Sequence, residues 1–322
     1  MTETTPNEQF KTHRIVHSDD VDLSVNSYGE PHNPTIVFVH GYPDSSEVWA
    51  PVVEILKHRF HVVTYDVRGC GDSTEPDWMW GYSLQALSSD LQAVMRTVCP
   101  TQPVHLVAHD WGSIQTWESV TDFKLKNRIA SYTSISGPCL DHVGQWIRSG
   151  LASGKLDKTG KVLNQLMHSW YVLAFQLPLL APSVWRLGLD KAWPKVLKKL
   201  EGLDDPEVSE TQRRDGVNGI NLYRANMLPR IVNPRERKTE VPVQLLVPTQ
   251  DNYVSAPLVE SAYPFVEQLW RRDIDAGHWV VKTHAEWVAN CVSEFVEFAE
   301  TGRENPSLAK ARVQADQASI EA

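Results

Sequence analysis

The sequence predicts an α/β protein in which a mostly parallel, eight-stranded sheet is flanked by helices and interrupted once by a helical insertion. Short β-branched runs alternate with longer amphipathic segments in the first half of the chain, which is the pattern of βαβ units. The strand signal then disappears over the 91 residues from 138 to 228 and resumes at residue 243. With 322 residues, the chain is long enough for one large α/β unit that carries such an insertion.

The first two strands are expected to form an antiparallel hairpin, because Ser18, Asp19 and Asp20 separate them. The later strands are near-continuous apolar runs, as is typical of parallel strands buried on both faces. Apolar residues three and four apart mark the helices. The predicted strands are Arg14–His17, Val21–Tyr28, Thr35–Val39, Val62–Tyr65, Val104–Ala108, Ile129–Ser134, Val243–Val247 and Leu269–Ile274. The predicted helices of the sheet layer are Glu47–Lys57, Leu84–Val98 and His284–Glu300.

These elements divide the chain into a core, a cap and a tail. The core consists of residues 1–137 and 229–300, and the helical cap domain, rich in Trp, Leu and Lys, takes residues 138–228. Residues 301–322 mix Ala, Gln, Lys and Asp with little periodicity. We therefore expect the tail to be a frayed helix or disordered.

Composition and charge exclude several classes of protein. The 31 Lys and Arg residues against 40 Asp and Glu give a net charge of −9, which excludes a nucleic-acid binder of the basic-patch kind. The N-terminus has no apolar stretch that could form a secretory signal. The most apolar segment, Val172–Trp185, contains two prolines and is shorter than the ~20 residues of a membrane-spanning helix. Four widely spaced cysteines fit a reducing compartment, so we expect a cytoplasmic protein without a membrane span.

A tight turn after the strand Val104–Ala108 carries the strongest chemical signal. His109, Asp110, Trp111 and Gly112 complete the pattern small-x-nucleophile-x-Gly, the strand-turn-helix elbow of α/β-hydrolases, whose tight turn requires small residues at both ends. Attack of a carboxylate on a carbonyl would form a high-energy anhydride, whereas attack on a tetrahedral carbon forms an ester that water can cleave. An aspartate at the nucleophile position, Asp110, therefore predicts that its carboxylate attacks an epoxide or a carbon that bears halide. The structural alternative is an aspartate that caps the next helix.

A general base and an orienting acid are expected after the last two strands. His278 follows the last predicted strand, where this fold has its histidine. Asp251 follows the preceding strand, 27 residues earlier, and would orient the imidazole ring and stabilise its charged form. Asp141 is a weaker alternative, and Asp275 is disfavoured because it is too close to the histidine in sequence.

An oxyanion hole is expected opposite the elbow. His40, Gly41, Tyr42 and Pro43 follow the first parallel strand, where this fold places a loop whose backbone N–H faces the nucleophile. We expect the N–H groups of Tyr42 and Trp111 to stabilise the oxyanion, by about 3 to 4 kcal/mol per donor. The alternative is an ordinary boundary between a strand and a turn.

From about Thr12 to Glu300 the chain resembles an epoxide hydrolase of the α/β-hydrolase superfamily. Besides the elbow and the oxyanion loop, three further motifs carry this resemblance: Arg68-Gly69-Cys70-Gly71-Asp72-Ser73, Tyr171-Val172-Leu173-Ala174-Phe175-Gln176 and Asn221-Leu222-Tyr223-Arg224-Ala225-Asn226. The chain is also similar to the hydrolase half of actinobacterial proteins that join such a domain to a short-chain dehydrogenase. Nothing after Glu300 resembles a Gly-rich nucleotide-binding unit, so no nicotinamide cofactor is expected.

The resemblance implies a two-step reaction without a metal or an organic cofactor. The phenols of Tyr171 and Tyr223 would donate to the epoxide oxygen while Asp110 attacks a ring carbon. Water activated by His278, held by Asp251, would then hydrolyse the ester and release a vicinal diol. The expected partners are a small lipophilic epoxide, alkyl- or aryl-substituted, and water, and a homodimer is left open.

Three other interpretations remain. Haloalkane dehalogenases share the Asp elbow, but they commonly have Asn where Tyr42 stands, and fluoroacetate-type dehalogenases usually have Arg where Trp111 stands. A protein of this fold can also bind ligands without catalysis. Finally, Tyr171 belongs to an apolar stripe at helical spacing that begins at Leu163, and such a tyrosine can be a core residue.

Overall fold

The computed structural model describes residues 11–168, 170–178, 180–203, 206 and 209–314, without the side chains of residues 168, 170 and 171. The predicted eight-stranded, mostly parallel sheet is confirmed, in the order β1-β2-β4-β3-β5-β6-β7-β8. Only the pairs β1–β2 and β2–β4 are antiparallel. The strands are β1 (Lys11–Ser18), β2 (Val21–Tyr28), β3 (Thr35–Val39), β4 (His61–Tyr65), β5 (Val104–His109), β6 (Ile129–Ile135), β7 (Val243–Pro248) and β8 (Leu269–Ile274).

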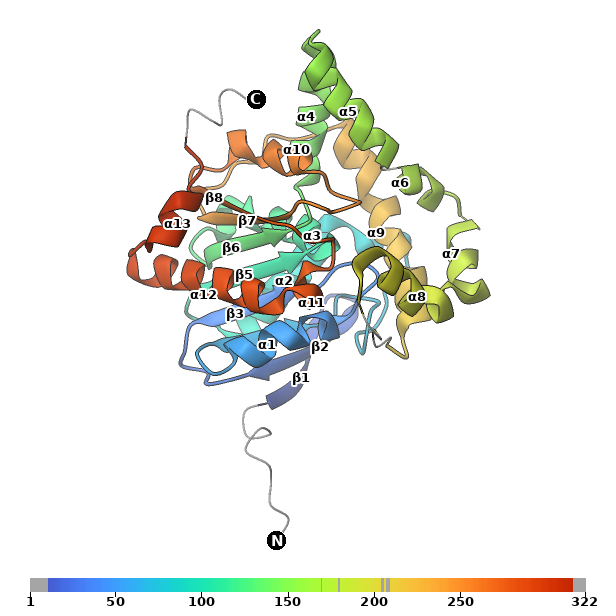
Figure 1. Cartoon of the computed structure of the whole chain (residues 1–322). Helices are drawn as coiled ribbons and strands as arrows, with labels where there is room; N and C mark the ends of the chain where they lie inside the picture. Colours follow the sequence, from blue (N-terminus) through green and yellow to red (C-terminus); the bar gives the residue numbers. More distant parts are fainter. Residues whose placement is uncertain (1–10, 169, 179, 204–205, 207–208, 315–322) are drawn as a thin grey trace.

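Helices cover both faces of the sheet (Figure 1). One face carries α1 (Ala50–Leu56), α11 (Val280–Thr283) and α12 (Ala285–Thr301), and the other carries α2 (Leu84–Val98), α3 (Trp111–Val120) and α10 (Ala256–Val259). On β3, Ile36 and Phe38 pack into the first layer, while Val37 and Val39 pack into the second. Successive side chains of a strand point to opposite faces, so burial on both faces explains the continuous apolar runs in the sequence.

Within the described residues, six α-helices lie between β6 and β7: α4 (Leu140–Ala152), α5 (Leu156–His168), α6 (Trp170–Phe175), α7 (Leu180–Val184), α8 (Asp190–Glu201) and α9 (Gln212–Val232). In Figure 1, α5 to α8 lie along one side of the molecule, and α9 lies between them and the sheet layer. The predicted cap limit at residue 228 falls inside α9, because Pro229 sits in its last turn, where a proline removes one backbone donor without ending the helix. No helix in the described ranges is long and apolar enough to cross a membrane.

Buried polar contacts attach α9 to the sheet layer. The Asp215 carboxylate accepts hydrogen bonds from the Gly71 N–H at 3.2 Å and from the Thr211 hydroxyl at 2.6 Å. Burial raises the pKa of Asp215 to about 6. Six residues before the end of α9, the side chain of Asn226 accepts a hydrogen bond from Leu84 N–H at 2.9 Å. These contacts fix α9 on the core, beside the first residue of α2.

The tail differs from the expected frayed or disordered segment. Residues Pro306–Ala311 form α13, and Leu308 is fully buried against Trp270 and Phe295. The side chain of Asn305 accepts a hydrogen bond from Leu308 N–H at 2.8 Å, which caps the helix. The expectation is wrong for these residues, because Asn followed by Pro at the first helical position is a helix-start signal and Leu308 is anchored in the core. Residues 315–322 lie outside the described part of the chain.

Candidate active site

Asp110 lies at the strained turn between β5 and α3. Its backbone has φ 52° and ψ −125°, a region that residues other than glycine rarely adopt. The turn packs so tightly that a Cβ at Gly112 would lie 2.2 Å from the Val39 carbonyl oxygen, and one at Gly137 would lie 2.2 Å from that of Asp110. Gly112, one of the two small residues expected at the elbow, is therefore required by a backbone contact, and Gly137 allows the segment after β6 to approach the turn.

The loop after β3 holds one oxygen of this carboxylate. The Tyr42 backbone N–H donates to Asp110 Oδ2 at 2.8 Å. A Cβ at Gly41 would lie 2.5 Å from the same oxygen, so only glycine fits beside it. His40 fixes the loop because its Nε2 accepts from Val67 N–H at 2.9 Å and its Nδ1 donates to the Gly41 carbonyl at 3.0 Å. This places one predicted oxyanion donor on the predicted nucleophile.

The same loop is bound to the cap. The Tyr42 hydroxyl donates to the Gly216 carbonyl at 3.0 Å and accepts from Trp185 Nε1 at 2.7 Å. The Pro43 carbonyl accepts from the Gln212 side chain at 2.7 Å.

The second predicted oxyanion donor is the Trp111 N–H. The backbone N–H groups of a first helical turn have no partner within the helix, and Trp111 is the first residue of α3. Its N–H is therefore free of the helix ladder, as the second predicted donor should be.

His278 lies on the other side of the Asp110 carboxylate. Its Nε2 is 3.5 Å from Asp110 Oδ1, and its Nδ1 is 2.9 Å from Asp251 Oδ2. The second oxygen of Asp251 accepts from the N–H groups of Tyr253 and Val254 at 2.7 and 3.0 Å. The structure thus brings the three predicted residues together as a chain of contacts. Asp110 follows β5, Asp251 follows β7 and His278 follows β8.

The opposite charges of His278 and Asp251 shift their pKa values, because each charge stabilises its neighbour. Burial alone would lower the pKa of His278, but the carboxylates of Asp251 and Asp110 raise it well above its usual value. For Asp251, burial raises the pKa, but the pairing with His278 and the two N–H donors has the larger effect. The pKa of Asp251 is therefore below its usual value. Burial and the neighbouring His278 lower the pKa of His109 to about 4. His109 is therefore neutral, and its Nε2 donates to the His278 carbonyl at 2.9 Å.

The other two candidate acids lie elsewhere. Asp141 forms buried ion pairs with Arg230 and Arg237, at 3.1 and 3.4 Å. Asp275 is exposed. Of the three aspartates considered, Asp251 is the one that contacts the His278 ring. Within the described residues, no group of three or more His, Cys, Asp or Glu side chains could hold a metal ion.

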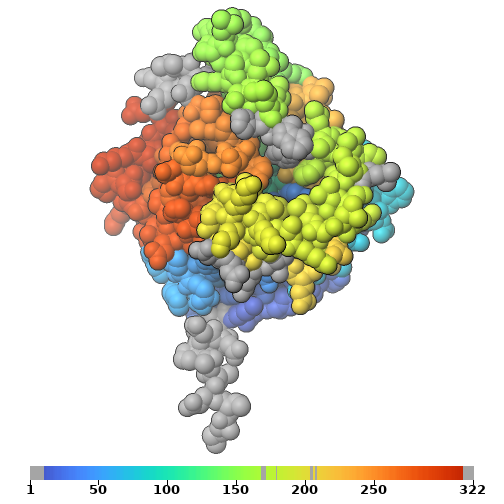
Figure 2. Space-filling view, turned by 45° about the vertical axis from the view of Figure 1, so that its right-hand side comes forward, coloured from blue at the N-terminus to red at the C-terminus, as the bar shows by residue number. Residues whose placement is uncertain are grey.

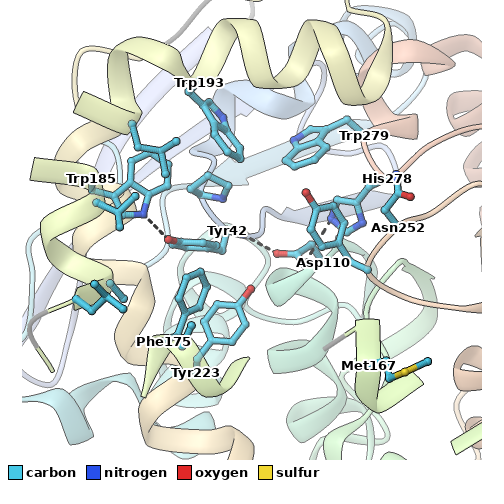
Figure 3. A pocket seen from close by; sticks show the side chains of 17 residues that line it. Tyr42, Asp110, Met167, Phe175, Trp185, Trp193, Tyr223, Asn252, His278 and Trp279 are labelled. Atoms are coloured by element: carbon cyan, nitrogen blue, oxygen red, sulfur yellow. Dashed lines mark hydrogen bonds and ion pairs between the residues drawn. The ribbon is translucent and has the colours of Figure 1, made fainter. Parts of the chain in front are cut away.

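A cavity of about 670 Å³ lies between Asp110 and His278 on the core side and the helices of the cap. Figure 3 shows the hydroxyl of Tyr223 directed into it, on the side of Asp110. The Tyr223 ring is buried, with ring centroids 4.7 Å from Trp111 and 4.8 Å from Phe175. The backbone of Tyr171 lies in α6, but its side chain is outside the described part of the structure. The lining residues are Tyr42, Pro43, Asp110, Met167, Ala174, Phe175, Leu180, Ala181, Val184, Trp185, Leu189, Trp193, Tyr223, Asn252, Tyr253, His278 and Trp279.

Two carboxylates that the sequence analysis missed hold the residue after His278. Trp279 donates its backbone N–H to Glu201 at 3.1 Å and its indole N–H to Asp44 at 2.9 Å. Glu201 is the last residue of α8, so the cap contacts the histidine loop directly. A Cβ at Gly277 would lie 2.3 Å from the Glu201 carboxylate. No local pattern indicates these contacts, because they exist only once α8 lies on the core.

Comparison with known proteins agrees with this fold. A family described as the alpha/beta hydrolase fold matches residues 34–285, which is most of the chain. The chain belongs to this family. The predicted fold class is therefore confirmed by the family match as well as by the sheet order.

Several individual relatives of this α/β-hydrolase are similar over different shares of their length. The probable oxidoreductase EphD of Mycobacterium tuberculosis is 35% identical over 309 residues, which are 93% of this chain and 52% of that protein. The chain thus spans about half the length of the first such relatives. Epoxide hydrolase A of the same organism is 31% identical over 130 residues, 40% of this chain and 39% of that protein. The crystal structure of epoxide hydrolase VrEH1 from Vigna radiata matches with a TM-score of 0.69 and 20% identity, over 91% and 99% of the two chains.

The shared charges predict that Asp110→Asn lowers the pKa of His278. The substitution keeps the shape of the side chain but removes one of the two carboxylates that raise this pKa. A pH titration of the ring by NMR, with the resonance assigned by its loss in His278→Gln, measures the change. Asp275→Asn is the matched control, because this exposed carboxylate is close in sequence but is not part of the site. An unchanged titration in Asp110→Asn would contradict the proposed coupling.

Proposed function

We propose that the chain is an epoxide hydrolase that converts lipophilic alkyl- or aryl-substituted epoxides to vicinal diols through an ester on Asp110. The observation that carries this proposal is the way the carboxylate is held: Oδ2 accepts from the Tyr42 N–H, and Oδ1 faces His278. This carboxylate lies at one wall of an apolar cavity, and the Tyr223 phenol enters from the cap. The names of epoxide hydrolase A and VrEH1 support the same assignment.

In the first step, Asp110 Oδ1 attacks a ring carbon of the epoxide. The new C–O bond forms as the ring C–O bond breaks, and the ring oxygen keeps the electron pair. A phenol from Tyr223 or Tyr171 donates a hydrogen bond and then its proton to that oxygen. Attack from the core side and donation from the cap side place the nucleophile and the proton donor on opposite faces of the substrate, as displacement at carbon requires.

Forming the ester prepares the base for the second step. The esterified Asp110 carries no negative charge, so one of the two carboxylates that raise the pKa of His278 is lost. The imidazolium then releases its proton, which passes through solvent to the phenolate left by the first step and restores the tyrosine. The neutral ring is now a general base, and Asp251 keeps it oriented.

Water then hydrolyses the ester. His278 Nε2 takes a proton from water, and the hydroxide attacks the carboxyl carbon of Asp110. Negative charge develops on Oδ2, where the Tyr42 N–H already donates and where the Trp111 N–H is the second donor. Each such donor typically stabilises the transition state by about 3 to 4 kcal/mol. The bond from the carboxyl carbon to Oδ1 breaks, and the carboxylic acid formed at Asp110 gives its proton to the departing alkoxide. The diol leaves with one oxygen that came from Asp110, and the Asp110 carboxylate is restored.

Dehalogenation has less support from the same site. A haloalkane dehalogenase needs N–H donors for the leaving halide, and Tyr42 stands where the second donor is commonly Asn. Two of the tryptophans in the cavity wall use their indole N–H groups within the protein, Trp185 toward Tyr42 and Trp279 toward Asp44. The phenol of Tyr223 suits an alkoxide leaving group, which needs a proton.

The first test of the proposal compares the two leaving groups. We expect the protein to convert styrene oxide to phenylethanediol and to release no bromide from 1-bromobutane. The two products are measured by chromatography and by a halide assay, with Asp110→Asn as the inactive control. Fast bromide release without diol would establish a dehalogenase instead. No turnover of any epoxide, with ligand binding unchanged in Asp110→Asn, would indicate a binding protein.

The second prediction concerns the covalent intermediate. His278→Gln removes the base that activates water but leaves the nucleophile, so the ester should accumulate when styrene oxide is added. Intact-mass spectrometry should show the protein mass increased by the mass of the epoxide, and digestion should place the adduct on Asp110. The double variant with Asp110→Asn is the control. Absence of an adduct while the wild-type protein still forms diol would contradict the two-step mechanism.

The third prediction separates ring opening from ester hydrolysis. Tyr223→Phe removes one phenol from the cap side of the cavity, so ester formation should slow by about 10²-fold or more. Ester hydrolysis, which uses His278 and the oxyanion loop, should change much less. Rapid-quench measurements in single turnover give the two rates separately. A larger effect on hydrolysis than on ester formation would exclude a role for Tyr223 in opening the ring.

A further inference from the structure

Exposed apolar side chains gather on one segment of the cap. Of the 18 large apolar residues that are exposed in the described part of the chain, 11 lie between residues 151 and 200. This segment has 50 of the 322 residues. Single exposed apolar residues are normal on a protein surface, but a cluster marks a contact surface. We define the cap outer face by the exposed side chains of Leu163, Leu166, Met167, Leu173, Leu180 and Leu187.

In helix α5, the exposed apolar side chains are not the ones that pack against the rest of the chain. Its inward side is covered, with Val162 fully buried and Gln165 5% exposed. Leu163, Leu166 and Met167 lie three and four residues apart, so they form a second apolar stripe, and they are 53%, 47% and 67% exposed. A surface helix normally turns one apolar stripe to the core and charged residues outward. The outward leucines of α5 therefore suit an apolar medium outside the protein.

The same segment has a charge opposite to that of the chain. Residues 151–200 contain eight Lys and Arg but only two Asp, a net charge of +6, whereas the whole chain carries −9. The other 272 residues therefore carry −15. Exposed cations flank the leucines in the sequence: Lys155 lies just before α5 and Lys161 on it, and Lys195 and Lys199 lie on α8. The molecule is thus acidic with one basic, leucine-rich lobe.

The entrance of the cavity opens on this lobe. Met167, Leu180 and Val184 line the cavity and are also 67%, 55% and 46% exposed, so they belong to its rim. Figure 2 shows a hollow between the yellow-green cap helices, the yellow α8 and the orange segment after β7. A molecule that left an apolar phase at the cap outer face would reach the cavity past apolar side chains.

We propose that the cap outer face docks on the surface of an anionic lipid bilayer, from which the cavity takes its epoxide. Leucines that enter the interface and cations that pair with lipid headgroups are the features of proteins that bind membrane surfaces. A second copy of the chain would bring two segments of +6 together, which like-charge repulsion opposes. The docking itself does not depend on catalysis; the delivery of substrate rests on the proposed function.

Vesicle sedimentation without substrate tests the docking. The protein should bind phosphatidylcholine vesicles that contain about one third phosphatidylglycerol at least tenfold more tightly than pure phosphatidylcholine vesicles, and added salt should weaken this binding. Leu163→Ser with Leu166→Ser, and separately Lys155→Glu with Lys161→Glu, should each reduce binding about tenfold or more. The matched controls are Phe123→Ser and Lys238→Glu, exposed residues of the same kinds outside the cap, which should leave binding unchanged.

Activity and oligomeric state distinguish the outcomes. None of these substitutions touches the cavity wall, so hydrolysis of dissolved styrene oxide should be unchanged, which also shows that the variants are folded. Hydrolysis of a long-chain epoxide held in anionic vesicles should fall with binding. Equal binding to anionic and neutral vesicles, or equal losses in the control variants, would overturn the proposal. So would a dimer in light scattering that becomes a monomer in the leucine variant, since the face would then join two copies.

Discussion

The separate partners of the two Asp110 oxygens are the constraint on which the rest of the site depends. Oδ2 is fixed by the Tyr42 N–H at 2.8 Å, and Oδ1 lies 3.5 Å from His278 Nε2. This arrangement requires the strained backbone at Asp110 and a glycine at position 41, because any Cβ there would overlap the carboxylate. One oxygen is thus held by the loop after β3, which leaves the other for the nucleophilic attack that we propose.

The same carboxylate also influences the protonation state of His278, the base of the proposed mechanism. As long as Asp110 is charged, it helps Asp251 to raise the pKa of His278, so the ring favours the protonated form. An ester at Asp110 would cancel this contribution at the moment when a neutral imidazole is needed. The order of the two steps would then follow from the charges of the site, without a conformational change in the core.

The sequence indicated the parts of this site that depend on strand order, and it failed where contacts depend on how the cap lies. The elbow residues and the histidine could be found because parallel strands end at one edge of the sheet. Asp251 could be chosen over Asp141 because it follows the strand directly before the one that precedes His278. The contact between Glu201 and the Trp279 N–H could not be found, because it joins the end of a cap helix to a loop 78 residues later. Helix α13 could not be found for another reason, since it has only six residues, including the proline of its Asn-Pro start. The role of Tyr171 stays a prediction, because its side chain lies outside the described part of the structure.

The central claim is that Asp110 gives one of its own oxygens to the product. A single turnover in ¹⁸O-water, with the protein in excess over styrene oxide, measures this directly by mass spectrometry of the diol and of the peptide that contains Asp110. The account predicts an unlabelled diol and one ¹⁸O atom in the Asp110 carboxylate. A diol that carries ¹⁸O after the first turnover, with Asp110 unlabelled, would show that water attacks the epoxide directly and would contradict the account.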